Sequence, residues 1–150
     1  MQPSTSARAH DDAGLICGWC FEPGVAARGV TLAQASPELE ALSSGSFLWL
    51  HFNLSHMGAR RWLEQHQGLA RAFREALDDD FRSTRIERDD DALVAVLNDV
   101  AYDFRYEPSE ISTLWVSVER HLVITARESP LRSVDRLRRA VREGNPIGSA

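Results

Sequence analysis

The chain has 150 residues, of which 43% are hydrophobic and 26% charged, and its formal net charge is −5 at pH 7. This composition is typical of one globular domain and excludes wholesale disorder and fibrous repeats. All 17 basic residues are arginine. The net negative charge argues against a protein dedicated to nucleic-acid binding. No apolar run approaches the ~20 residues that span a bilayer. The first 12 residues have no apolar core, so they do not resemble a signal peptide. Two cysteines cannot make a disulfide framework, so the simplest compartment for this chain is a reducing cytosol.

Residues 1–13 are small, polar and aperiodic, so we expect a flexible tail followed by one domain over 14–150. A short apolar run over 15–21 predicts the first strand, and a turn at 22–24 ends it. A second, weak strand is expected over 29–32. Ser36 as N-cap and Pro37 as first helical residue predict a short helix to Leu42. The strongest strand is 47–54, and apolar residues on both faces at its start suggest a central strand covered on both sides.

Apolar residues at helical spacing over 62–77 predict a helical stretch, which Gly68 splits into two helices. A short strand surrounds Ile86. Apolar runs over 93–100, 111–118 and 122–126 predict an antiparallel meander, with a polar loop over 101–110. A last helix opens at Ser129-Pro130 with Leu131, Val134, Leu137 and Val141 on one face, and it ends at 143–144. These elements form a mixed sheet with helices packed against it, of class α/β or α+β.

Cys17 and Cys20 form a C-x-x-C pair, which suits a redox pair or half of a zinc site. Two features favour plain packing instead. The chain has no second C-x-x-C or C-x-x-H, and residues three apart on a strand point to opposite faces. His51, His56 and His66 lie near one another in sequence and suit a transition metal, although such histidines are more often packed and hydrogen-bonded.

Two acidic triplets, Asp78-Asp79-Asp80 and Asp89-Asp90-Asp91, flank the strand around Ile86. Carboxylate oxygens suit hard cations such as Mg²⁺, and a cation relieves the repulsion between neighbouring carboxylates. We interpret the second triplet as a solvated hairpin turn and the first as a weak cation attractor. The motifs of nucleophilic, phosphate-binding and zinc-protease sites are missing. Five arginines over 132–142 make either a solvated face or a docking face.

The motifs then converge on one family. The segment 47–53 (FLWLHFN), followed by 59–63 (ARRWL), resembles the "WLHLN … WL" segment of the CorA-like metal-ion transporters, with the zinc branch called ZntB as the best match. The segments 74–77, 83–86 and 93–97 look like that family's "R-[DE]-A-L … RPR[VI]" strand pair. The strand 122–127 looks like its "LIVSTR" strand, and 134–135 with 142–144 fits the helix that follows. The resemblance covers about residues 15–144.

The resemblance implies a homopentameric protein of the bacterial inner membrane whose N-terminal part is a cytoplasmic funnel. That funnel is an α/β domain with a mixed sheet between helix layers, so helices are expected on both faces. A stalk helix, two membrane spans and a G-x-N pore signature follow in the family and do not occur in this sequence. We therefore expect an excised or truncated soluble portion that cannot transport by itself, monomeric or weakly oligomeric in isolation.

Two departures from the family pattern bear on the ion. Ser83-Thr84 replaces the family's arginine-proline, which removes a fixed φ. The magnesium branch has an acidic regulatory ligand on the helix before this strand, where the resemblance places Ala76, between Glu75 and Asp78. This departure favours zinc over magnesium.

The resulting hypothesis is a non-enzymatic, Zn²⁺-related cytoplasmic domain that needs no cofactor. Five acidic copies around one axis would concentrate divalent cations by electrostatic focusing. Possible Zn²⁺ or Mg²⁺ ligands are His56, Glu75, Asp78, Asp79 and Asp80. The alternatives are a CorA-type Mg²⁺/Co²⁺ transporter domain, a small cytosolic metal or thiol protein that uses Cys17 and Cys20, and an interaction module that docks through the arginine-rich last helix.

Overall fold

The structure, a computed structural model, describes residues 14–66, 68–100 and 111–144. The tail expected over 1–13 and the loop expected over 101–110 lie outside these residues. The described strands are β1 (Leu15–Phe21), β2 (Arg28–Gly29), β3 (Phe47–Asn53), β4 (Arg85–Asp89), β5 (Ala92–Val100), β6 (Ile111–Val118) and β7 (Leu122–Arg127). The described helices are α1 (Leu32–Ala41), α2 (Met57–Gln65), α3 (Arg71–Asp78) and α4 (Arg132–Arg142).

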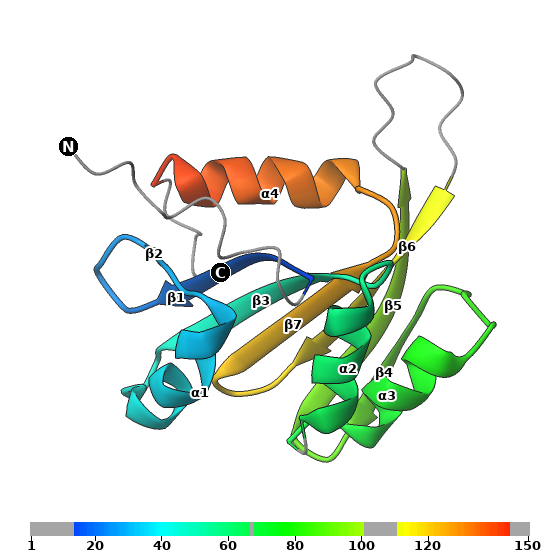
Figure 1. The fold of residues 1–150 in the computed structure, drawn as a ribbon, viewed down its shortest axis with the longest axis horizontal. Coiled ribbons are helices and arrows are strands. Elements are labelled where there is room, and N and C mark those ends of the chain that lie inside the picture. Colours follow the sequence, from blue (N-terminus) through cyan, green and yellow to red (C-terminus); the bar gives the residue numbers. More distant parts are fainter. Residues whose placement is uncertain (1–13, 67, 101–110, 145–150) are drawn as a thin grey trace.

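All the described strands belong to one mixed sheet with the order β2-β1-β3-β7-β6-β5-β4 (Figure 1). β3 and β7 are parallel, and every other neighbouring pair is antiparallel. The meander predicted over 93–126 is confirmed as β5-β6-β7. The strand predicted to be central, β3, lies inside the sheet between β1 and β7.

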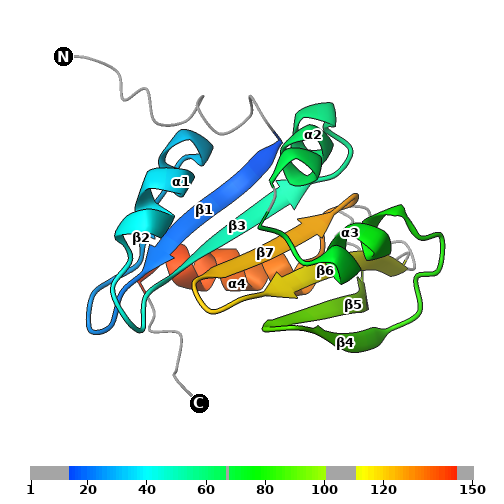
Figure 2. The same cartoon turned by 90° about the horizontal axis from the view of Figure 1, so that it is seen from below.

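Helices cover both faces of this sheet. α1, α2 and α3 lie on one face and α4 crosses the other (Figures 1 and 2). The larger core lies under the first three helices and includes Leu50, Phe52, Phe73 and Trp115. A smaller core under α4 consists of Cys17, Trp49, Leu131, Val134 and Val141. The expected α/β class, with a mixed sheet flanked by helices on both faces, is therefore confirmed.

The predicted start of the first helix is wrong. α1 begins five residues upstream of Pro37, at Leu32, and Pro37 lies inside it. Thr31 is the N-cap: its N–H donates to Gln34 Oε1 at 3.0 Å, while Gln34 N donates to the Thr31 carbonyl at 3.1 Å. These bonds satisfy donors at the helix start and outweigh the Ser-Pro signal. The weak strand is also shorter than expected, because Leu32 already belongs to the helix.

The last helix also begins later than predicted: α4 starts at Arg132 with Leu131 as its N-cap, and not at Ser129-Pro130. Other local signals predicted the chain well. Gly68 lies between α2 and α3, as expected. Asp90, with a φ of 49°, forms the β4–β5 turn together with Asp91, so the second acidic triplet is a hairpin turn. Gly144, with a φ of 75°, follows the end of α4. Leu137 departs from the predicted apolar face, since 42% of it is exposed.

Candidate functional site

The parallel strands β3 and β7 create a distinctive place at their carboxyl ends. The chain leaving β3 enters α2 on one face of the sheet, whereas the chain leaving β7 enters α4 on the opposite face (Figure 2). Ligands of open α/β sheets bind at such switch points, because the diverging chains leave a crevice there. The residues that follow the two strands, Ser55 and Glu128, lie at this point.

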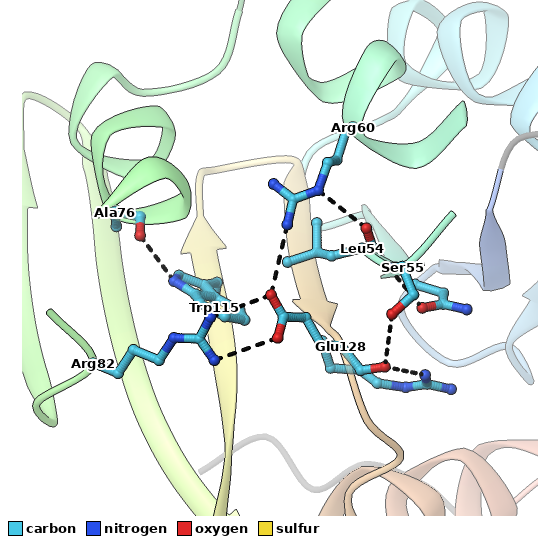
Figure 3. Close-up of polar contacts among 9 residues, drawn as sticks. Leu54, Ser55, Arg60, Ala76, Arg82, Trp115 and Glu128 are labelled. Carbon is cyan, nitrogen blue, oxygen red and sulfur yellow. Dashed lines mark hydrogen bonds and ion pairs between the residues drawn. The ribbon is translucent and has the colours of Figure 1, made fainter. Parts of the chain in front are cut away.

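Glu128 is the centre of a polar cluster at the switch point (Figure 3). Arg82 donates from its two terminal nitrogens to the two carboxylate oxygens of Glu128, each at 3.3 Å. Arg60 Nη2 lies 3.6 Å from Glu128 Oε1, and Arg60 Nε donates to the Leu54 carbonyl at 3.1 Å. One carboxylate therefore connects the end of β7 to α2 and to the segment between α3 and β4.

Backbone and aromatic contacts complete this cluster. The Glu128 carbonyl accepts from Ser55 Oγ at 3.4 Å and from Arg127 Nη1 at 3.3 Å. The Arg82 guanidinium lies 5.2 Å from the ring centre of the buried Trp115. We call Ser55, Arg60, Arg82, Arg127 and Glu128 the Glu128 cluster. It contains three arginines and one carboxylate, so its net charge is positive. The cluster therefore repels cations and attracts anionic groups.

A cavity of about 140 Å³ lies beside the Glu128 cluster, between α2 and α3. Arg60 of the cluster lines it, and so does Leu54, whose carbonyl accepts the hydrogen bond from Arg60. Its remaining lining residues are Leu63, Glu64, Arg74, Leu77 and Asp78. The switch point thus has an ion-paired cluster with a partly open cavity beside it.

On the other face of the sheet, His51 is buried under α4, with 1% of its surface exposed. Its Nδ1 lies 2.7 Å from Thr125 Oγ1, and Trp49 Nε1 donates to the same hydroxyl at 2.8 Å. Because the hydroxyl accepts from Trp49, its own proton is free to donate to His51 Nδ1. Burial, together with the nearby positive charges of Arg127 and Arg138, lowers the pKa of His51 to about 3. His51 is therefore neutral near pH 7 and has a structural role.

The structure places two of the predicted metal ligands in local interactions. His56 is the N-cap of α2, where its Nδ1 accepts from Gly58 N at 3.0 Å. Glu75 accepts from Arg71 Nε at 2.8 Å, one turn earlier on α3.

The other three predicted ligands, Asp78, Asp79 and Asp80, are exposed where α3 ends. Asp79 accepts from Phe81 N at 2.9 Å and lies 3.6 Å from Arg85 Nη2. Across the residues that the structure describes, no group of three or more His, Cys, Asp or Glu side chains is placed to hold a metal ion. The metal-ligand set remains a prediction.

The two cysteines lie in different cores. Cys17 packs under α4, whereas Cys20 belongs to the core on the opposite face, as the strand geometry predicts. Both thiols are free, and burial raises the pKa of each. A raised thiol pKa disfavours the reactive thiolate, so this geometry argues against the thiol-protein alternative.

Comparison with known proteins decides the family. The family model described as "CorA-like Mg2+ transporter protein" matches residues 44–149. The chain belongs to this CorA-like family. No curated protein sequence matches it.

Solved structures agree with this CorA-like assignment. Full-length CmaX is 25% identical with a TM-score of 0.75, over 90% of this chain and 41% of CmaX. The ZntB cytoplasmic domain from Vibrio parahaemolyticus RIMD 2210633 is 20% identical with a TM-score of 0.67, over 89% of this chain and 51% of that one. The soluble domain of CorA from Methanocaldococcus jannaschii is 13% identical with a TM-score of 0.58, over 88% and 48%. This CorA-like chain thus spans about half the length of these relatives or less.

Sequence reasoning missed the Glu128 cluster of this CorA-like domain. The available signal was a polar residue just after each of two buried strands, Ser55 after β3 and Glu128 after β7, but nothing local indicates that these strands are parallel neighbours. Within the described ranges, no helix is both long and apolar enough to cross a membrane.

Proposed function

We propose that this chain serves as the cytoplasmic domain of a divalent-cation transporter, and that its cargo is Zn²⁺. The family match over residues 44–149 carries the transport part of the proposal. The domain has no catalytic role in this proposal. It belongs to a homopentamer at the cytoplasmic face of the bacterial inner membrane, where acidic copies concentrate cations.

Two observations support Zn²⁺ over Mg²⁺. One structural relative is called ZntB. The other is the residue found on α3 at the position where the magnesium branch has its acidic regulatory ligand, according to the family resemblance. Ala76 occupies it, is 3% exposed, and accepts a hydrogen bond from Trp115 Nε1 at its carbonyl. A carboxylate at this position would face the core instead of a neighbouring subunit.

The cation-binding role falls to the exposed residues around that position. Glu75, Asp78, Asp79 and Asp80 are all exposed near the end of α3. We propose that they and His56 attract the cation weakly, before it enters the transport path. This role uses charge accumulation across five copies and does not need a closed ligand cage.

Measuring the metal content of cells tests which cation the protein transports. The gene that encodes this chain is deleted and restored in its host, and cellular Zn, Mg, Co and Ni are measured by mass spectrometry. A change in Zn alone is expected. An equal change in Mg and Co would favour the CorA-type alternative, and no change in any metal would contradict the proposal.

Titration calorimetry of the isolated chain tests the cation-attracting residues. Zn²⁺ heat is expected to fall in His56→Ala and Asp78→Ala. Asp91→Ala, which removes an exposed acid from the β4–β5 turn, is the matched control and is expected to keep the heat of the parent chain. Equal losses of Zn²⁺ heat in all three variants would mean that Zn²⁺ responds only to the overall surface charge, and would contradict a role for these particular residues.

A further inference from the structure

The α2–α3 cavity itself has no role in the proposed transport function, although its exposed lining residue Asp78 is also one of the proposed cation-attracting residues. Its volume of about 140 Å³ is well above the ~10–15 Å³ that one water molecule needs, so it has room for a small organic molecule. Leu54, Leu63 and Leu77 supply its apolar wall. It lies at the carboxyl end of β3, beside the switch point at which α/β proteins bind ligands.

Two guanidinium groups line the same cavity. Arg74 donates one terminal N–H to the His66 carbonyl, while its Nε is buried and has no hydrogen-bond partner among the described residues. Arg60 uses Nε for the Leu54 carbonyl and Nη2 for Glu128. Because a guanidinium carries N–H donors on every nitrogen, both side chains retain donors for a further acceptor. An unsatisfied buried donor is costly, so an anionic oxygen bound to Arg74 would stabilise its guanidinium in this position.

Two carboxylates line the cavity as well. Glu64 and Asp78 are exposed, and neither forms an ion pair within the part of the chain that the structure describes. The opposite charges of this cavity therefore do not neutralise each other by direct contact. Glu64 and Asp78 disfavour a multiply charged anion, and the two arginines disfavour a free metal cation.

A ligand that satisfies all four groups carries both charges and an apolar part. We propose that the α2–α3 cavity binds a small aliphatic amino acid: its carboxylate bonds Arg74 and Arg60, its ammonium faces Glu64 and Asp78, and its side chain contacts the leucines. The cavity size suits a branched chain of a few carbons. Charge-assisted hydrogen bonds are stronger than neutral ones, so the two ends set the orientation.

Nuclear magnetic resonance titration of the chain with L-valine tests this proposal. Saturable shifts are expected in α2 and α3. Isovalerate and isobutylamine each retain one charge and the branched chain, and each is expected to bind about tenfold or more weakly. Equal binding of either analogue, or no saturable binding of valine, would overturn the proposal.

Variants locate the site. Arg74→Gln is expected to weaken valine binding about tenfold or more, whereas Arg71→Gln is the matched control on the exposed side of α3 and is expected to leave it unchanged. Arg74 also holds the His66 carbonyl, so Glu64→Gln and Asp78→Asn provide tests at exposed positions. These two are expected to weaken valine binding and to leave isovalerate binding equal or stronger. Unchanged valine binding in both would contradict the proposal.

Discussion

Asp89 at the end of β4 accepts a hydrogen bond from Ala72 N in the first turn of α3, at 2.9 Å. The N-cap of α3 is Ala70, whose side chain has no acceptor. Asp99 does the same for α4 on the opposite face: its Oδ2 accepts from Ser133 N at 3.1 Å, next to the apolar N-cap Leu131. A carboxylate on a strand thus satisfies one free N–H group at the start of each helix and interacts favourably with the helix dipole.

Removal of the carboxylate at 89 is expected to destabilise the domain. Asp89→Ala should lower the free energy of unfolding by about 1 kcal/mol, the usual cost of losing a helix cap. Urea unfolding followed by circular dichroism measures the change. Asp91→Ala, two residues along in the turn, serves as control and should change it by less than about 0.5 kcal/mol. Equal effects would show that Asp89 acts only through surface charge.

Loss of the carboxylate at 128 is expected to weaken the switch point. Glu128→Gln breaks contacts with both Arg60 and Arg82, whose side chains are about half exposed. Exposed pairs contribute little singly, so we expect a loss of about 1 kcal/mol at low salt and less at high salt. A double-mutant cycle with Arg82→Gln, by urea unfolding, measures the coupling. The Arg71–Glu75 pair, whose side chains are 88% and 63% exposed, is the control and should couple less. A coupling no larger than that of the control would contradict this role of Glu128.

The buried His51 predicts a pH dependence of stability. Its pKa is about 3 in the folded chain, against ~6.5 in the unfolded chain, so the unfolded state binds more protons between these values. Stability is therefore present above about pH 6.5 and is lost as the pH falls toward 3. The groups around His51 are Thr125 and Trp49, with Arg127 and Arg138 nearby.

His51→Gln is expected to reduce the dependence of stability on pH. The measurement is the free energy of unfolding in urea at several values between pH 7.5 and pH 5. Burial and Arg74 also lower the pKa of His66, which is less buried, so His66→Asn should reduce this dependence less. An unchanged pH slope in His51→Gln would show that other groups control acid sensitivity.

The thiols are expected to be unreactive in the folded chain. Both cysteines are buried, Cys17 at 8% and Cys20 at 2% exposure, and burial raises the pKa of each. A disulfide-exchange reagent such as DTNB should modify them slowly at pH 8, and rapidly after denaturation. Rapid modification of the folded chain, or an intramolecular disulfide after mild oxidation, would restore the redox hypothesis.

Local patterns in the sequence were enough for most elements of this domain. Apolar runs predicted β1, β3 and the β5-β6-β7 meander, because the residues that specify a strand face lie two positions apart. Gly68 and Gly144 marked helix ends for an equally local reason. Even the opposite placement of Cys17 and Cys20 follows from the period of a single strand.

Pairing between distant segments was decided by the tertiary structure alone. Ser55 and Glu128 are 73 residues apart, and they meet only because β7 inserts beside β3 in parallel. Tertiary packing likewise brings the Asp89 carboxylate to Ala72 N of α3, 17 residues away. Side-chain periodicity specifies which face of an element is apolar, but the choice of neighbour depends on how all the apolar faces are buried together, so no local pattern encodes it.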